Sequence, residues 1–224
     1  MDKRFLGILV AIIVIFIGVF AVSQHSNNKS GSGSSHNSSQ PTNHITGEGK
    51  KGVTLIEYGD YQCPVCEAYY QPLKQAYTQL SQDIFFQFRN LPLPIHNNAY
   101  AAARAAEAAG LQGKYWQMHD VLYENQNSWA SSTSPLNIYK SYAQQLGLDV
   151  NKFSTDYTSE RVNNSIQADI NAFSKTGKDE ATPTLFLDGK ALDNASLTDP
   201  QTGIPSVDKI AAVISAEITA KNKQ

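Results

Sequence analysis

The sequence predicts an α/β domain in which a block of helices separates two β-containing parts. Three short apolar, β-branched runs, typical of buried strands, lie at 53–58, 84–88 and 184–187. Helical periodicity and helix caps fill the long interval between the second run and the third. The predicted order is therefore β-α-β, a helical insertion over about 97–176, and then β-β-α.

The first part begins with the strand at 53–58. Residues 59–62 turn the chain, and a helix is expected from Cys63 to about residue 80. The second strand, at 84–88, is closed by the proline-rich turn at 91–94.

The insertion is expected to hold four helices, over about 98–110, 114–125, 134–147 and 158–176. Ser134 precedes Pro135, which pairs an N-cap residue with a first-turn proline. Gly110 and Gly147 are suited to end helices. The last of the four carries an apolar stripe at spacings of four, four and three, made by Val162, Ile166, Ile170 and Phe173.

The final part returns to strand character at 184–187. Asp188-Gly189 follows at once, a strong signal for a two-residue hairpin turn. A last helix is expected to start at Ser206, with one apolar face formed by Val207, Ile210, Ile214 and Ile218.

The N-terminus carries an uncharged apolar run of 18 residues, 5–22, directly after Lys3 and Arg4. Its length approaches the ~20 residues that span a bilayer as a helix. We expect 1–22 to be a retained transmembrane anchor, with the N-terminus cytoplasmic and the rest of the chain extracytoplasmic. A cleaved signal peptide, cut near 21–23, is the alternative, and it also exports the domain.

Residues 23–49 are expected to be a flexible linker, and 50–224 the folded domain. From residue 23 to 44 the chain has no large apolar residue, so it has little surface to bury. His25, His36 and His44 lie in this stretch, but their loose spacing favours a solvated linker over a metal-binding tract.

Composition narrows the function classes. Lys and Arg number 18 against 20 Asp and Glu, for a net charge of −2, so no basic surface for nucleic acid is expected. The only cysteines are Cys63 and Cys66. With no further cysteine to cross-link distant segments, this pair is either redox-active or half of a metal site.

The Cys63-Pro64-Val65-Cys66 motif follows a strand and starts a helix, which favours redox chemistry. The positive end of a helix stabilises a thiolate, and a second sulfur one turn later can close a disulfide or release a bound partner. A zinc site usually needs four ligands, and His96 and His119 do not have zinc-binding spacing. A purely structural disulfide between these two cysteines would close too short a loop to stabilise the fold much. We therefore expect a redox-active pair, with neither a metal nor a cofactor.

Two further residues are candidates for the site. Pro183 precedes the strand at 184–187, where a cis peptide bond after Thr182 would expose backbone groups to a polypeptide. Glu57 lies six residues before Cys63. If it points inward, its buried carboxyl would have a raised pKa and could exchange a proton with Cys66; otherwise it points to solvent.

The chain resembles the DsbA-like thioredoxin family, in particular its membrane-anchored bacterial branch. The resemblance covers about residues 50–220. It rests on 53–60 with the Cys-Pro-Val-Cys motif, on Phe88-Arg89-Asn90-Leu91-Pro92-Leu93, on the Ala-rich and Tyr-Trp-x-Met-His run at 98–123, and on Thr182-Pro183-Thr184-Leu185-Phe186-Leu187-Asp188-Gly189.

The resemblance implies a thioredoxin fold with an inserted helical subdomain. It implies Cys63 as an exposed nucleophile, Cys66 as the buried resolving sulfur, Pro183 as a cis-proline and Glu57 as a buried acid. It also implies that Thr182, Pro64 and Val65 contact the substrate.

Two departures leave the direction of electron flow open. Pro64-Val65 lacks the histidine of the strongest oxidants of this family, and Thr182 replaces the valine common in oxidases. The resemblance favours an oxidase that acts on exported proteins and is reoxidised by a membrane quinone-linked thiol oxidase. A reductase or isomerase on the same fold is the alternative, and a tethered chaperone or binding module without a redox role is a third hypothesis.

Overall fold

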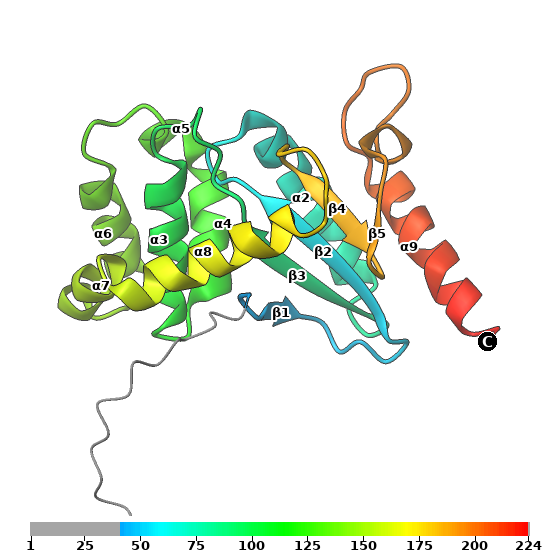
Figure 1. Cartoon of the computed structure of the whole chain (residues 1–224), viewed down its shortest axis with the longest axis horizontal. Coiled ribbons are helices and arrows are strands. Elements are labelled where there is room, and N and C mark those ends of the chain that lie inside the picture. Colours follow the sequence, from blue (N-terminus) through cyan, green and yellow to red (C-terminus); the bar gives the residue numbers. More distant parts are fainter. Residues whose placement is uncertain (1–40, 224) are drawn as a thin grey trace, which may run out of the picture. The chain divides into compact units, whose positions relative to one another are not determined.

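A five-stranded sheet in the order β1-β3-β2-β4-β5 is the centre of the structure, a computed structural model that describes residues 41–223 (Figure 1). The strands are β1 (His44–Thr46), β2 (Val53–Gly59), β3 (Ile84–Asn90), β4 (Thr184–Leu187) and β5 (Lys190–Ala191). β2 and β3 are parallel, and the other neighbouring strands are antiparallel. β2 is buried because it is the central strand.

Helices cover both faces of this sheet. α2 (Pro64–Gln79) and α9 (Val207–Lys221) contact each other on one face, where Leu55, Phe86 and Leu185 belong to the main core. α8 (Glu160–Ser174) crosses the other face (Figure 1), and its Phe173 packs edge-on against Tyr58. The short 3-10 helix η1 (Asn194–Leu197) lies between β5 and α9 along the chain.

The predicted α/β class and the helical insertion are confirmed. The insertion comprises α3 (Ala99–Gly110), α4 (Tyr115–Glu124), α5 (Gln126–Trp129), α6 (Pro135–Gln145), α7 (Val150–Tyr157) and α8. We had not predicted α5 and α7. α5 is a single turn, too short for a periodic signal, whereas α7 carries one: Val150, Phe153 and Tyr157 recur at three and four, after the N-cap Asp149.

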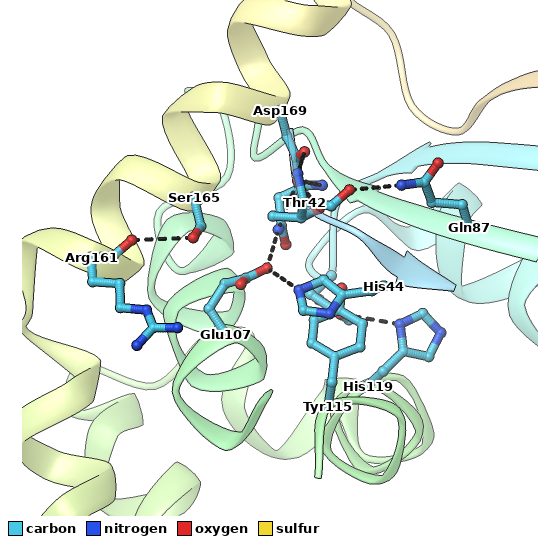
Figure 2. Close-up of polar contacts among 11 residues, drawn as sticks. Thr42, His44, Gln87, Glu107, Tyr115, His119, Arg161, Ser165 and Asp169 are labelled. Carbon is cyan, nitrogen blue, oxygen red and sulfur yellow. Dashed lines mark hydrogen bonds and ion pairs between the residues drawn. The ribbon is translucent and has the colours of Figure 1, made fainter. Parts of the chain in front are cut away.

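The predicted linker boundary at residue 49 is wrong, because β1 already belongs to the fold. Thr42 is buried and donates hydrogen bonds from its N–H and its hydroxyl to Asp169, both at 2.7 Å. His44 lies 2.9 Å from Glu107 and stacks on Tyr115, as Figure 2 shows. Hydrogen bonds to the buried carboxylates of Asp169 and Glu107 hold this segment in the fold. The absence of large apolar residues therefore did not mean that the segment is a flexible linker.

The predicted hairpin turn at Asp188-Gly189 is confirmed. Both residues have positive φ, 47° and 78°, as a type I′ turn between antiparallel strands requires. The Asp188 carboxylate also accepts a hydrogen bond from the N–H of Thr54 at 2.8 Å. This contact links the turn between β4 and β5 to the start of β2.

The predicted anchor or signal segment at 1–22, and most of the predicted linker, lie outside the described residues. Among the helices of residues 41–223, none combines the length and the apolar character that a membrane crossing requires.

Candidate active site

Cys63 and Cys66 lie where α2 begins, next to the carboxyl end of β2. Cys63 is the N-cap residue and Pro64 occupies the first turn, as predicted. The N–H of Cys63 donates to the Asp60 carbonyl at 3.1 Å, and the Cys63 carbonyl accepts from the N–H of Glu67 at 3.1 Å. Both cysteines are present as free thiols. The structure therefore describes the reduced form of the pair.

The two thiols have opposite electrostatic surroundings. A hydrogen bond from the Cys66 thiol is the main cause that lowers the pKa of Cys63 to about 5, against the effect of burial. Backbone N–H groups of Val65 and Cys66, at the helix start, act in the same direction. Burial, followed by the hydrogen bond to Cys63, raises the pKa of Cys66 well above its ordinary value. Cys63 is thus the thiolate of the pair.

Accessibility agrees with this order of reactivity, but it corrects one expectation. Cys66 is completely buried, whereas Cys63 is 5% exposed. Cys63 is therefore the more accessible sulfur, yet the prediction of an exposed nucleophile is wrong as stated. The segment before β4 lies close to this sulfur, since the carbonyl oxygen of Thr182 is 3.4 Å from Sγ of Cys63. Pro64 and Val65 are exposed beside it.

The prediction of a cis peptide bond between Thr182 and Pro183 is confirmed. The amide of Asn194 donates to the Pro183 carbonyl at 3.0 Å, and the hydroxyl of Tyr69 donates to the Asn194 carbonyl at 3.2 Å. Tyr69 belongs to α2, so these contacts tie the segment around Pro183 to the helix that carries the cysteines. Sequence reasoning missed Asn194, which lies outside any recognisable motif.

Glu57 points inward, as one of the two predictions for it required. It is 3% exposed, and within residues 41–223 its Oε1 has no hydrogen-bond partner. Burial, reinforced by the negative charge of Cys63, raises the pKa of Glu57 to about 8. Gly59 leaves room for this carboxyl, because a Cβ there would lie 3.1 Å from Oε1 and 2.5 Å from the Phe88 ring.

Two further residues contact the redox pair, and sequence reasoning missed both. Gln126, the first residue of α5, donates from its buried amide to the carbonyls of Tyr61 at 2.8 Å and Cys63 at 3.1 Å. Asp60 donates from its N–H to the Cys66 sulfur at 3.5 Å. Asp60 lies in the predicted turn at 59–62, directly before the cysteine motif, so its position was a usable signal.

The histidines considered as zinc ligands have other partners. His96 contacts the carboxylate of Asp60, and His119 lies 3.1 Å from the hydroxyl of Tyr61. Within the described part of the chain, no three side chains of the metal-binding kinds stand close enough together to hold an ion.

Comparisons with known proteins place the chain in a family. The model of a thioredoxin family matches residues 39–204, well over half of the chain. Among curated proteins, the Na(+)/H(+) antiporter NhaA 1 of Mycolicibacterium gilvum is 33% identical over 150 residues, and that of Salinispora arenicola 34% over 148. Each match covers 66% of this chain, which spans less than a quarter of the length of either relative.

Solved structures share the fold at low sequence identity. BdbD from Bacillus subtilis has a TM-score of 0.66 at 21% identity, over 80% of this chain and 96% of its own. The α-DsbA1 protein of Wolbachia pipientis has a TM-score of 0.63 at 20% identity, over 82% and 96%. A thioredoxin-like oxidoreductase from Silicibacter pomeroyi has 0.61 at 22%, over 80% and 91%. With its Cys-x-x-Cys pair on this fold, the chain belongs to the thioredoxin family and resembles the DsbA and BdbD proteins in architecture.

Proposed function

We propose that this thiol–disulfide oxidoreductase works as a dithiol oxidase, which introduces disulfides into exported proteins through Cys63 and Cys66. The observation that carries the proposal is the position of Cys63 at the start of α2 beside a fully buried Cys66, an arrangement that lowers the pKa of Cys63 to about 5. A stabilised Cys63 thiolate favours the dithiol form of the pair over its disulfide. The disulfide is therefore readily transferred to a substrate.

The transfer proceeds by two exchange steps. A substrate thiolate attacks Cys63 of the disulfide, a mixed disulfide forms, and Cys66 leaves as a thiolate that takes up a proton. Glu57 can supply this proton, because with a pKa of about 8 it is protonated at neutral pH. A second substrate thiolate then attacks the substrate sulfur of the mixed disulfide and releases the Cys63 thiolate. The substrate loses two electrons, and the cysteine pair gains them.

We assign substrate contact to the residues around Cys63. Thr182 supports this assignment because its carbonyl oxygen lies 3.4 Å from the Cys63 sulfur. Pro64 and Val65 follow Cys63 directly in the sequence and are exposed. Val65 is 49% exposed, so it offers an apolar surface beside the pair. An unfolded polypeptide, with apolar side chains and free backbone groups, suits such a surface.

The proposed location is outside the cytoplasm, with 5–22 holding the protein in the membrane. An uncharged run of this length after Lys3 and Arg4 supports it. In this setting a membrane quinone-linked thiol oxidase would accept the two electrons from the dithiol. The intact mass of the native protein tests the anchor: we expect the apolar run to be present, whereas a mature N-terminus near residue 24 would refute it.

The resting redox state of the pair in cells tests the direction of electron flow. Rapid acid quenching followed by a thiol-alkylating reagent should find Cys63 and Cys66 mostly as a disulfide. A pair found mostly as dithiol would instead favour a reductase or isomerase, which the threonine before Pro183 makes the second candidate. Refolding activity that survives Cys63→Ser would favour a chaperone without a redox role.

A further inference from the structure

We infer that His96 is a positioning residue for the redox pair and acts on it through Asp60. The inference rests on Cys63 and Cys66 as the reactive pair, but not on the direction in which they pass electrons. His96 lies in the segment between β3 and α3, 36 positions after Asp60 along the chain. Its side chain is 18% exposed, whereas that of Asp60 is 0% exposed.

The Asp60 carboxylate accepts three hydrogen bonds. Its Oδ1 accepts from the N–H of Gln62 at 2.7 Å. Its Oδ2 accepts from the N–H of Leu93 at 2.9 Å and lies 2.7 Å from Nδ1 of His96. Because a carboxylate is an acceptor, Nδ1 carries the proton in this contact. The ring of His96 is therefore the side-chain donor to a completely buried carboxylate.

The backbone of Asp60 contacts both cysteines. Its N–H donates to the Cys66 sulfur at 3.5 Å, and its carbonyl accepts from the N–H of Cys63 at 3.1 Å. A rotation of Asp60 would change both contacts together. The carboxylate side chain prevents that rotation, since it is bound to the segment before α3 through Leu93 and His96.

Loss of the Nδ1 donor would leave a buried carboxylate with one partner fewer. Such a group either turns toward another donor or keeps an uncompensated negative charge. The first change moves the Asp60 N–H away from the sulfur of Cys66, the residue whose thiol donates a hydrogen bond to the Cys63 thiolate. The second change leaves a negative charge that repels the Cys63 thiolate. Both effects destabilise the thiolate, so the pKa of Cys63 should rise above its present value of about 5.

The choice of ring atom gives a sharp pair of variants. The amide of asparagine can occupy the place of Nδ1, whereas that of glutamine reaches the place of Nε2. His96→Asn should therefore keep the donor to Asp60, and His96→Gln should lose it. Both replacements are neutral and polar, so a difference between them reports the position of the donor rather than the loss of a histidine.

His44 provides the matched control because its geometry is reversed. It contacts the Glu107 carboxylate through Nε2, at 2.9 Å. At this position Gln should keep the contact and Asn should lose it. His44 lies in β1, and its ring contacts Glu107 and stacks on Tyr115. Neither variant should change the pKa of Cys63, although His44→Asn should lower the free energy of unfolding.

The measurement is the rate of Cys63 alkylation by iodoacetamide against pH, in the reduced, full-length protein. For His96→Gln we expect the midpoint to move up by about one unit, which lowers the rate at pH 5 about fivefold. His96→Asn should keep the midpoint of the wild type. If glutamine prevents folding, His96→Ala removes the donor without adding bulk and gives the same readout.

Two results would overturn the inference: equal midpoints in His96→Gln and the wild type, or the same upward shift in His44→Asn. A rate that falls by one factor at every pH would also contradict it, because that pattern indicates poorer access of the reagent to Cys63 at an unchanged pKa. The proposed function is tested apart from this, since wild-type exchange activity and the resting redox state do not depend on the variants.

Discussion

Glu57 places an ionisable carboxyl in the core, close to the reactive sulfurs. With a folded pKa of about 8 against an ordinary value of 4.5, it keeps its proton in the folded protein while the unfolded chain ionises. Its contribution to stability is therefore fully present below pH 4.5 and is lost as the pH rises through 8. At pH 7 the buried Glu57 carboxyl lowers the free energy of unfolding by about 3 kcal/mol relative to its value below pH 4.5.

Glu57→Gln should remove this cost and slow thiol–disulfide exchange, because the amide cannot supply a proton to Cys66. Urea unfolding of the reduced proteins between pH 4.5 and 8 measures the first effect. The variant should become progressively more stable than the wild type across this range, by about 3 kcal/mol at pH 7. A constant difference at all pH values would show that Glu57 does not titrate as we describe.

The two cysteines should give different trapped products. Cys66→Ser removes the resolving sulfur after Cys63 has reacted, so mixed disulfides with exported proteins should accumulate. Cys63→Ser leaves only the buried Cys66, so it should form none. Non-reducing gels of cells that express each variant measure the adducts. Equal amounts from both variants would contradict the assigned roles.

At the scale of single elements, β1 is held to the fold by buried polar groups. Asp169 of α8 accepts from the N–H and hydroxyl of Thr42, and from the N–H and side-chain amide of Asn90. The same Asn90 amide donates to Glu107 at 2.7 Å, and Glu107 contacts His44 (Figure 2). Two buried carboxylates thus join β1 to β3, α3 and α8.

Asp169→Asn should release β1 and lower the free energy of unfolding by about 2 kcal/mol, since an amide N–H would then face hydrogen-bond donors. Hydrogen exchange at the β1 amides and urea unfolding measure the two effects. Asp208→Asn, an exposed change in the first turn of α9, is the control and should cost much less. Unchanged exchange in β1 would mean that strand pairing alone holds it.

At the scale of the whole described fold, side-chain amides join the turn before α2 to the helical insertion. Gln62 donates to the Ala130 carbonyl at 2.8 Å and accepts from the N–H of Asn98 at 2.6 Å. Gln126 supplies the reciprocal contacts, from α5 to the carbonyls of Tyr61 and Cys63. The insertion therefore takes part in shaping the active site.

Gln126→Ala should lower the free energy of unfolding by about 1–3 kcal/mol and slow exchange, because the buried Tyr61 carbonyl loses a donor. Gln144→Ala, the same change at an exposed position of α6, should alter neither property. Urea unfolding and the rate of disulfide transfer to a reduced peptide provide the measurements. An exchange rate in Gln126→Ala equal to the control would restrict Gln126 to a purely structural role.

The sequence by itself determined the parts that depend on local patterns. Apolar runs located β2, β3 and β4, and the spacing of Val162, Ile166, Ile170 and Phe173 located α8. Cys63, Cys66 and Pro183 were found because reactive sulfurs at a helix start and a proline before a strand are recognisable within a few residues. Burial and periodicity are properties that one element shows alone.

Only the tertiary structure decided which polar groups meet. Thr42 is hydrogen-bonded to Asp169, 127 positions later in the sequence. His96 contacts Asp60 at a separation of 36 positions, and Gln126 contacts Cys63 at a separation of 63. Hydrogen bonds between distant segments leave no periodic signal, since each partner is one polar residue among many. The inclusion of β1 in the fold, the role of Asp60 and the burial of Cys63 therefore depend on how the sheet, the insertion and the segment before β4 come together.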